Sequence, residues 1–261
     1  MGHPFEQHKQ AEVPASPDEV WAAIATGPGI DSWFMGRNQV QPGASGAVRT
    51  VFADYAPELQ VTEWDPAHRF AYGSGQAPDG RFIAYEFLIE GRTGGSTVLR
   101  AVTSGFVPGD DWADEFEAMT LGGELYFRTL VEYLSPSPPP LAPFIGRFAA
   151  PVTAFGPPGA TWASDRARLY RGLGLTDPAD RGDPVRFSAD EIGTVDGVVY
   201  FANAHAIGVR TPDAMYRFLR GFGKPLVAAH HLFAADADPA RSEQAWASWL
   251  RRILAPTTKE V

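Results

Sequence analysis

The sequence predicts an α+β protein, in which a curved antiparallel sheet wrapped on one long helix is followed by a second, smaller α+β domain. Short β-type runs follow one another between about residues 39 and 106. A single helical periodicity then covers residues 112–134, and a proline-rich stretch at residues 135–143 follows it as a stiff spacer. These three observations predict a first domain at residues 1–134 and a second at residues 144–261.

Length and composition describe a folded protein and exclude several kinds of site. The chain has 261 residues, and roughly 150 residues per domain gives about two domains. It contains no cysteine, which excludes disulfides, iron–sulfur clusters, thiolate metal sites and cysteine nucleophiles. The net charge of −9 repels phosphate backbones, so we expect no nucleic-acid partner. Because the start lacks the apolar core of a signal peptide and no stretch approaches about 18 apolar residues, we expect a cytoplasmic protein without a membrane span.

The first domain is predicted to begin with a strand and two helices. Phe5–Val13 is mostly polar with weak alternation, which is typical of a half-exposed strand. Ser16–Glu19 is a strong helix start, because the serine can cap, the proline fits the first helical position and the glutamate completes a capping box. Gly27–Gly29 is expected to end this helix, and Ile30–Phe34 leaves room for only a short second one.

Five β-type runs come next, separated by turn residues. In the fourth run, the alternate residues Ile83, Tyr85, Phe87 and Ile89 are uniformly apolar or aromatic. This alternation predicts that they form the inward face of an antiparallel sheet. The five runs are Val48–Phe52, Leu59–Trp64, Phe70–Tyr72, Phe82–Glu90 and Thr97–Thr103.

The long helix is predicted from apolar residues at steps of three and four between Trp112 and Leu134. Gly122 and Gly123 stand in its middle, where each glycine costs about 1 kcal/mol relative to alanine. Such a cost is tolerable if another backbone or a cavity needs the room.

The second half has less regular patterning, and its predicted order of elements does not copy the first half. We expect one helix to begin at Thr211-Pro212-Asp213 and to carry Met215, Phe218, Leu219 and Phe222. The other predicted elements are helices at Trp162–Leu173 and around Trp246–Ile253, and strands at Val185–Phe187, Val198–Val209 and Leu226–Phe233.

Several segments in the first domain carry a family resemblance. They are Val13–Trp21, Ile30–Phe34, Val61–Pro66, Arg69–Tyr72, Gly94–Arg100, Ser104–Phe106 and the helix Trp112–Leu134. In this order, over about residues 5–134, the chain resembles the helix-grip superfamily (SRPBCC; START, birch-allergen-like and polyketide-cyclase-like domains). Within it, the chain is similar to the subgroup named after the activator of a heat-shock chaperone ATPase. The resemblance implies a deep apolar cavity between sheet and helix. A degenerate helix-grip is one alternative for the fold of the second domain.

Aromatic residues are the strongest functional signal, and they fit either a plain hydrophobic core or a ligand cavity. Buried tyrosines favour the cavity, because a buried phenol needs a polar partner and could orient a ligand. The candidate ligand-binding residues are Trp33, Phe34, Trp64, Tyr72, Tyr85, Phe87, Phe106, Trp112, Phe116, Met119, Gly123 and Tyr126.

The sequence predicts no catalytic residue, no metal site and no cofactor. The adjacent His230 and His231 would point to opposite faces of a strand, so they cannot chelate one metal as a pair. We therefore expect binding and sequestration of a small hydrophobic or aromatic molecule, for metabolite resistance or transport. One alternative is a chaperone-associated or stress-related module with a protein partner, which would expose an apolar or charged patch. A second is an enzyme of the cyclase or aromatase type, which would need a polar cluster inside the cavity.

Overall fold

The computed structural model describes residues 2–53, 55–109, 112–135, 143–221 and 225–255. The chain divides into two compact units, unit 1 up to Pro151 and unit 2 from Val152 onward. No helix in these ranges is both long and apolar enough to cross a membrane.

The division falls later than the proline-rich stretch, most of which lies outside the described residues. The cause is a short segment that packs on unit 1 after that stretch. The Tyr133 hydroxyl donates a hydrogen bond to the Arg147 carbonyl at 2.9 Å, and the Ala149 amide donates one to Ser32 Oγ at 3.0 Å. Residues 144–149 therefore belong with unit 1 rather than with the second domain.

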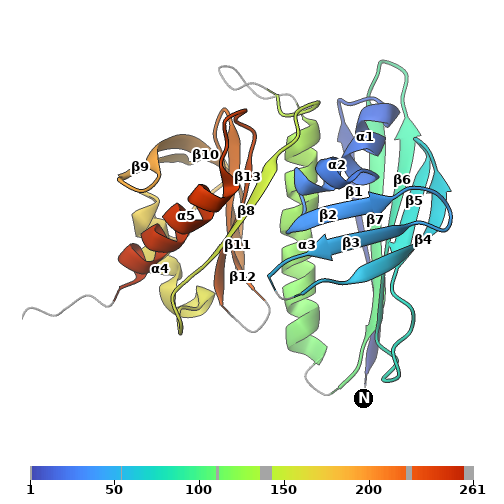
Figure 1. Ribbon diagram of the computed structural model, residues 1–261, viewed down its shortest axis with the longest axis horizontal. Helices are drawn as coiled ribbons and strands as arrows, with labels where there is room; N and C mark the ends of the chain where they lie inside the picture. The colour runs from blue at the N-terminus through green and yellow to red at the C-terminus, as the bar shows by residue number, and fades with distance from the viewer. Residues whose placement is uncertain (1, 54, 110–111, 136–142, 222–224, 256–261) are drawn as a thin grey trace, which may run out of the picture. The chain divides into compact units, whose positions relative to one another are not determined.

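Unit 1 has the predicted helix-grip architecture. Its seven-stranded sheet has the order β1-β7-β6-β5-β4-β3-β2, so the first strand of the chain pairs with the last strand of the unit. All its strand pairs are antiparallel, and α3 runs alongside the sheet (Figure 1). The elements are β1 (His3–Val13), α1 (Pro17–Ile24), α2 (Gly27–Asp31), β2 (Arg37–Gln41), β3 (Ala47–Val51), β4 (Glu58–Asp65), β5 (Arg69–Gly73), β6 (Phe82–Gly91), β7 (Thr97–Val107) and α3 (Trp112–Leu134).

The predicted helix start is confirmed, but the predicted end is wrong. Ser16 Oγ accepts from the Glu19 amide at 3.3 Å, and Glu19 Oε2 accepts from the Ser16 amide at 2.8 Å, which is a complete capping box. Gly27–Gly29 begins α2 rather than ending α1, because proline is well tolerated in the first helical turn. Glycine is needed at Gly27, where an added Cβ would lie 2.6 Å from the Asn38 carbonyl oxygen. Strand β2, which starts just before Asn38, was not predicted.

Unit 2 repeats the connectivity of unit 1 with one strand fewer and with one helix in place of α1 and α2. Its six-stranded sheet has the order β8-β13-β12-β11-β10-β9, so again the first strand pairs with the last. The expectation that its element order does not copy the first half is therefore wrong. The elements are β8 (Ala150–Phe155), α4 (Trp162–Gly172), β9 (Pro184–Ala189), β10 (Gly193–Asn203), β11 (Ala206–Arg210), β12 (Ala214–Arg220), β13 (Leu226–Leu232) and α5 (Pro239–Leu254).

The helix predicted after Thr211 is the strand β12. Met215, Arg217 and Phe218 are all fully buried, so both faces of the strand are covered. A strand buried on both faces gives a continuous apolar run that periodicity cannot distinguish from a helix. The capping-like residues form a turn instead, in which the Thr211 amide donates to the Ala214 carbonyl at 2.9 Å. The single strand predicted at Val198–Val209 is the hairpin of β10 and β11.

The core of unit 2 fills the space between its sheet and its two helices. Both helices contribute buried side chains to it, and α5 contributes two of its three tryptophans. Its large buried members include Trp162, Leu169, Val199, Ile207, Val209, Phe218, Leu226, Trp246, Trp249 and Leu250.

Candidate functional site

The strand register of unit 1 shows which residues share the side of the sheet that faces α3. Tyr72 pairs with Tyr85, Tyr85 with Thr103, and Thr103 with Gln7, so these four residues form one row across the sheet. The next row is formed in the same way by Phe70, Phe87, Ala101 and Lys9. Gln7 is hydrogen-bonded to Thr120 of α3, which identifies this side as the helix-facing one. We call this side of β1, β5, β6 and β7 the grip face.

The structure brings seven of the predicted site residues together in a chain of ring contacts. Tyr72 lies 5.3 Å from Tyr85 between ring centroids, and Phe34 lies 6.3 Å from Tyr85 and 4.8 Å from Tyr126. Phe70, which was not predicted as a site residue, links Trp64 to Tyr72. The seven connected residues are Trp33, Phe34, Trp64, Tyr72, Tyr85, Phe87 and Tyr126.

Two further predicted residues form a second cluster at the start of α3. Trp112 stacks on His3 with ring centroids 4.3 Å apart, and Phe116 packs on Phe5 at 5.8 Å. Met119 follows on α3 and is partly buried. This cluster covers one end of the grip face.

Phe106 does not join either cluster. Gly105 lies on the grip face opposite Ile83, so the next residue along β7 points to the other side of the sheet. There its ring lies beside Gly80, where an added Cβ would be 3.2 Å from the ring. Phe106 is therefore not part of the candidate site.

The side chains of the grip face differ in how far they are buried. At one end Phe5 and Val107 are buried, and at the other end Val13 and Leu99 are buried. The two rows described above lie between these buried residues, and several of their side chains are partly exposed. Ile83 and Ala11, in the rows of Phe5 and Leu99, are also partly exposed. In the two middle rows the partly exposed side chains are Gln7, Lys9, Tyr85, Ala101 and Thr103. We call them the open stretch of the grip face.

The open stretch contains a polar cluster shared by β1 and α3. Gln7 Nε2 donates to Thr120 Oγ1 at 2.7 Å, and Lys9 Nζ donates to Gln7 Oε1 at 3.3 Å. Burial lowers the pKa of the Lys9 amine, while the charge of Glu124 on α3 acts in the opposite direction. Gly123 of α3 faces this amine, because an added Cβ would lie 3.2 Å from Lys9 Nζ.

Two tyrosine hydroxyls offer further hydrogen-bonding capacity. Burial raises the pKa of Tyr72 and of Tyr85 above the usual value for a phenol, so both hydroxyls keep their protons at neutral pH. Neither hydroxyl has a hydrogen-bond partner in the described part of the chain. Each can therefore donate a hydrogen bond to a bound molecule.

Three residues of this site were not predicted from the sequence, namely Gln7, Lys9 and Thr120. A usable signal exists in β1, where Phe5, Ala11 and Val13 alternate with charged or polar residues. This alternation places Gln7 and Lys9 on the apolar side of the strand, where a polar side chain needs a reason. Thr120 had no such signal, because a threonine on a long helix commonly hydrogen-bonds its own backbone, as it also does here to the Phe116 carbonyl at 2.8 Å.

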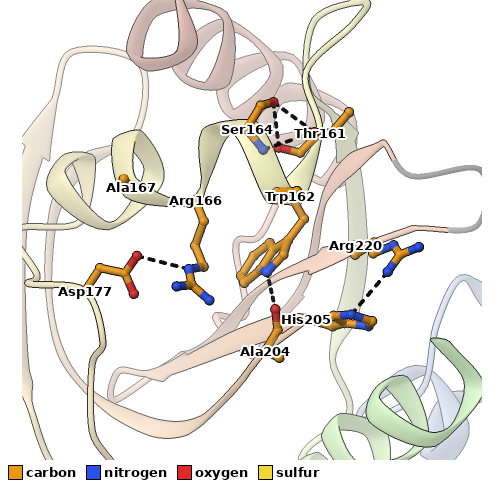
Figure 2. Close-up of a pocket in the computed structure, with 10 residues that line it drawn as sticks. Thr161, Trp162, Ser164, Arg166, Ala167, Asp177, Ala204, His205 and Arg220 are labelled. Carbon is orange, nitrogen blue, oxygen red and sulfur yellow. Dashed lines mark hydrogen bonds and ion pairs between the residues drawn. The ribbon is translucent and has the colours of Figure 1, made fainter. Parts of the chain in front are cut away.

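Unit 2 has a separate surface pocket with a volume of about 530 Å³ at the start of α4 (Figure 2). Its cationic side chains already have partners. Arg166 Nε pairs with Asp177 at 3.0 Å, and Arg220 Nη1 lies 3.2 Å from His205 Nε2 (Figure 2). The pocket therefore has a mixed polar lining without a concentrated charge of one sign. Its residues are Thr161, Trp162, Ala163, Ser164, Arg166, Ala167, Asp177, Ala204, His205 and Arg220.

His230 and His231 are core residues of unit 2. His230 Nδ1 accepts from the Arg217 amide at 3.1 Å, and its ring lies 4.3 Å from that of Trp246. Burial and the neighbouring Arg217 charge lower the pKa of His230 well below the usual value, so it is neutral. In the ranges that the structure describes, no group of three or more His, Cys, Asp or Glu side chains is placed to hold a metal ion.

Residues 14–135 match the family model described as "Activator of Hsp90 ATPase homolog 1-like protein", which confirms the resemblance predicted from the sequence. The Aha1 dimer from Colwellia psychrerythraea is 20% identical with a TM-score of 0.40, and the match covers 50% of this chain and 96% of that one. The di-domain ARO/CYC protein BexL from the BE-7585A biosynthetic pathway is 14% identical with a TM-score of 0.44, and the match covers 97% and 99%. DynU16, from the dynemicin biosynthetic locus, is 17% identical with a TM-score of 0.42, and the match covers 95% of each chain. None of the curated proteins matches the chain.

Proposed function

We propose that unit 1, whose residues 14–135 match the Hsp90 ATPase activator-like family, binds a small hydrophobic or aromatic molecule between its grip face and α3. The observation that carries this proposal is the open stretch. Its inward-facing side chains are partly exposed although they lie between buried residues, Phe5 and Val107 on one side and Val13 and Leu99 on the other. The partly exposed rings of Phe34, Tyr85 and Tyr126 supply apolar surface at this site, and its burial by a small molecule would contribute about 25 cal/mol per Å² removed from water.

The proposed site is smaller than the sequence analysis expected. Trp33, Tyr72 and Phe87 are at most 5% exposed and pack on other rings, so they form its floor. The partly exposed residues around the open stretch would contact the molecule directly. From the predicted set these are Phe34, Tyr85, Phe116, Met119, Gly123 and Tyr126.

The proposed mechanism is sequestration in the cytoplasm, for metabolite resistance or transport. It needs no catalytic residue, because burial of apolar surface supplies the affinity and the Tyr85 hydroxyl fixes the orientation. The protein-interaction alternative has less support, since only Val51, Tyr55 and Phe148 are large, exposed apolar residues in the described part of unit 1. A cyclase or aromatase would use the same site and would add a chemical step to the binding proposed here.

Calorimetric titration with 2-naphthalenemethanol tests the site, because this neutral probe is aromatic and small. Gly123→Leu places a large side chain against Lys9, in the space proposed for the molecule. The variant should bind at least about tenfold more weakly, which corresponds to a loss of about 1.4 kcal/mol of binding free energy. Ala113→Leu is the matched control, because Ala113 is an exposed residue of the same helix. The control should bind like the wild type. Equal binding by the Gly123→Leu variant would contradict the proposed site.

A further inference from the structure

We propose that the molecule held on the grip face carries a carboxylate, and that Lys9 is the residue that binds it. This inference rests on the proposed function and specifies the chemical class of its ligand. It assigns to Lys9 a role in ligand selection.

Lys9 has no ion pair within the described residues, although the charge of Glu124 on α3 acts on it. Its row on the grip face consists of the apolar residues Ala101, Phe87 and Phe70. Its amine donates one hydrogen bond to the neutral Gln7 and forms no ion pair within the described residues. An ammonium group has three donors, so two remain for a ligand. A partly buried ammonium without an ion pair is unfavourable, and a bound carboxylate would reduce that penalty.

The other side of β1 shows that this placement is unusual. Glu6 and Glu12 lie on the exposed side of the same strand, so a lysine on that side would have carboxylates as neighbours. Lys9 lies instead on the side that faces α3, where Glu124 acts on it only through its charge. Burial lowers the pKa of this amine from its ordinary value of 10.5, and the charge of Glu124 raises it.

Neighbouring residues hold the amine and leave space in front of it. Gln7 is fixed by its bond to Thr120, so the oxygen that it turns to Lys9 has a defined position. Gly123 leaves free the position where any side chain would press on the amine. The rings of Phe34, Tyr85 and Tyr126 lie together on the same side and offer apolar surface for the rest of the molecule. The arrangement therefore suits an aromatic acid, with its carboxylate at Lys9.

The test compares 2-naphthoate with 2-naphthalenemethanol, which share one ring system and differ in charge. Calorimetry on the full chain should show that the wild type binds naphthoate at least about tenfold more tightly than the alcohol, as charge-assisted hydrogen bonds are roughly twice as strong as neutral ones. Lys9→Met keeps an unbranched side chain only one atom shorter and removes the charge, so it should abolish this preference while leaving the affinity for the alcohol within about threefold. His8→Met is the matched control on the exposed side of β1 and should keep the preference.

Each outcome is decisive. If the alcohol binds and naphthoate is not preferred, or if the preference survives in Lys9→Met, the role of Lys9 is wrong while the proposed function stands. If the Lys9→Met variant loses affinity for both probes equally, Lys9 shapes the site without recognising charge, which also overturns the inference. If neither probe binds the wild type, both the inference and the proposed function fail.

Discussion

The two units share one connectivity but differ in what lies between sheet and helix. In unit 2, α5 contributes Trp246 and Trp249 from its middle, each at most 2% exposed, and they fill the space against the sheet. In unit 1, the middle of α3 holds Gly122 and Gly123, and no residue of the helix before Leu125 is buried. The comparison teaches that the order of strands and helices does not create a binding site. The side chains on one face of the last helix decide whether the same fold encloses a solid core or an accessible surface.

The largest expected difference between the units is the effect of removing a large helix side chain. Trp249 is 1% exposed and packs on Phe187, Phe218 and Trp246, so Trp249→Ala should lower the free energy of unfolding of unit 2 by about 3–5 kcal/mol. Phe116→Ala on α3 should cost unit 1 only about 1 kcal/mol, because Phe116 is partly exposed. Hydrogen-exchange mass spectrometry reads peptides of the two units separately and can measure both values.

Equal losses of stability for these two variants would contradict the difference in packing between α3 and α5. They would mean that the start of α3 is as tightly packed as α5 and that unit 1 has no room for a ligand. A loss below about 1 kcal/mol for Trp249→Ala would instead mean that the core of unit 2 closes around the missing ring.

The sequence predicted the elements whose local signals agree with their environment. The predicted limits of α3, Trp112 and Leu134, are those observed, because one apolar face repeats without a break over 23 residues. The alternation in Phe82–Glu90 was equally reliable, because one face of this strand packs in the core. The capping box at Ser16 was reliable too, because it satisfies the amides at the helix start by local hydrogen bonds.

The predictions failed where burial depends on the rest of the fold. The β12 segment is buried on both faces, so its sequence lacks the alternation that identifies a strand. Lys9 and Gln7 belong to a strand that is polar overall and alternates only weakly, and its pairing with β7 and the bond from Gln7 to Thr120 establish that they face α3. The aromatic residues were recognised as a group, but their local pattern could not show that Phe106 points away from the others.

A prediction of intermediate size concerns stability at low pH, where His230 in unit 2 and Asp31 in unit 1 should contribute with opposite signs. His230 in unit 2 is buried and neutral, with a pKa well below its usual value, so below about pH 6.5 the unfolded chain binds a proton that the folded chain does not. Stability of unit 2 should therefore fall as pH decreases from about 6.5, by at most about 1.4 kcal/mol per pH unit from this residue.

In unit 1 the corresponding shift has the opposite sign. Burial raises the pKa of Asp31, although its hydrogen bonds with Asn38 act in the other direction. The folded state therefore binds this proton more readily than the unfolded state, and the contribution of Asp31 favours folding as pH falls. Urea titrations between pH 7 and pH 5, followed by hydrogen exchange, should show unit 2 losing stability first. Loss of unit 1 before unit 2, or a pH-independent unit 2, would show that His230 does not control the acid response.

The smallest effect compares two helix caps, one in each unit. Ser16 Oγ accepts from the Glu19 amide at 3.3 Å at the start of α1, and Asp238 Oδ1 accepts from the Arg241 amide at 3.1 Å at the start of α5. Ser16→Ala and Asp238→Ala should each lower the stability of their own unit by about 1 kcal/mol, because each leaves one amide of the first turn without its partner. Hydrogen exchange should then change in α1 and its neighbours for the first variant, and in α5 and its neighbours for the second. If either variant lowers protection equally in both units, the units unfold as one, and the packing of each helix cannot be altered without changing the stability of the other unit.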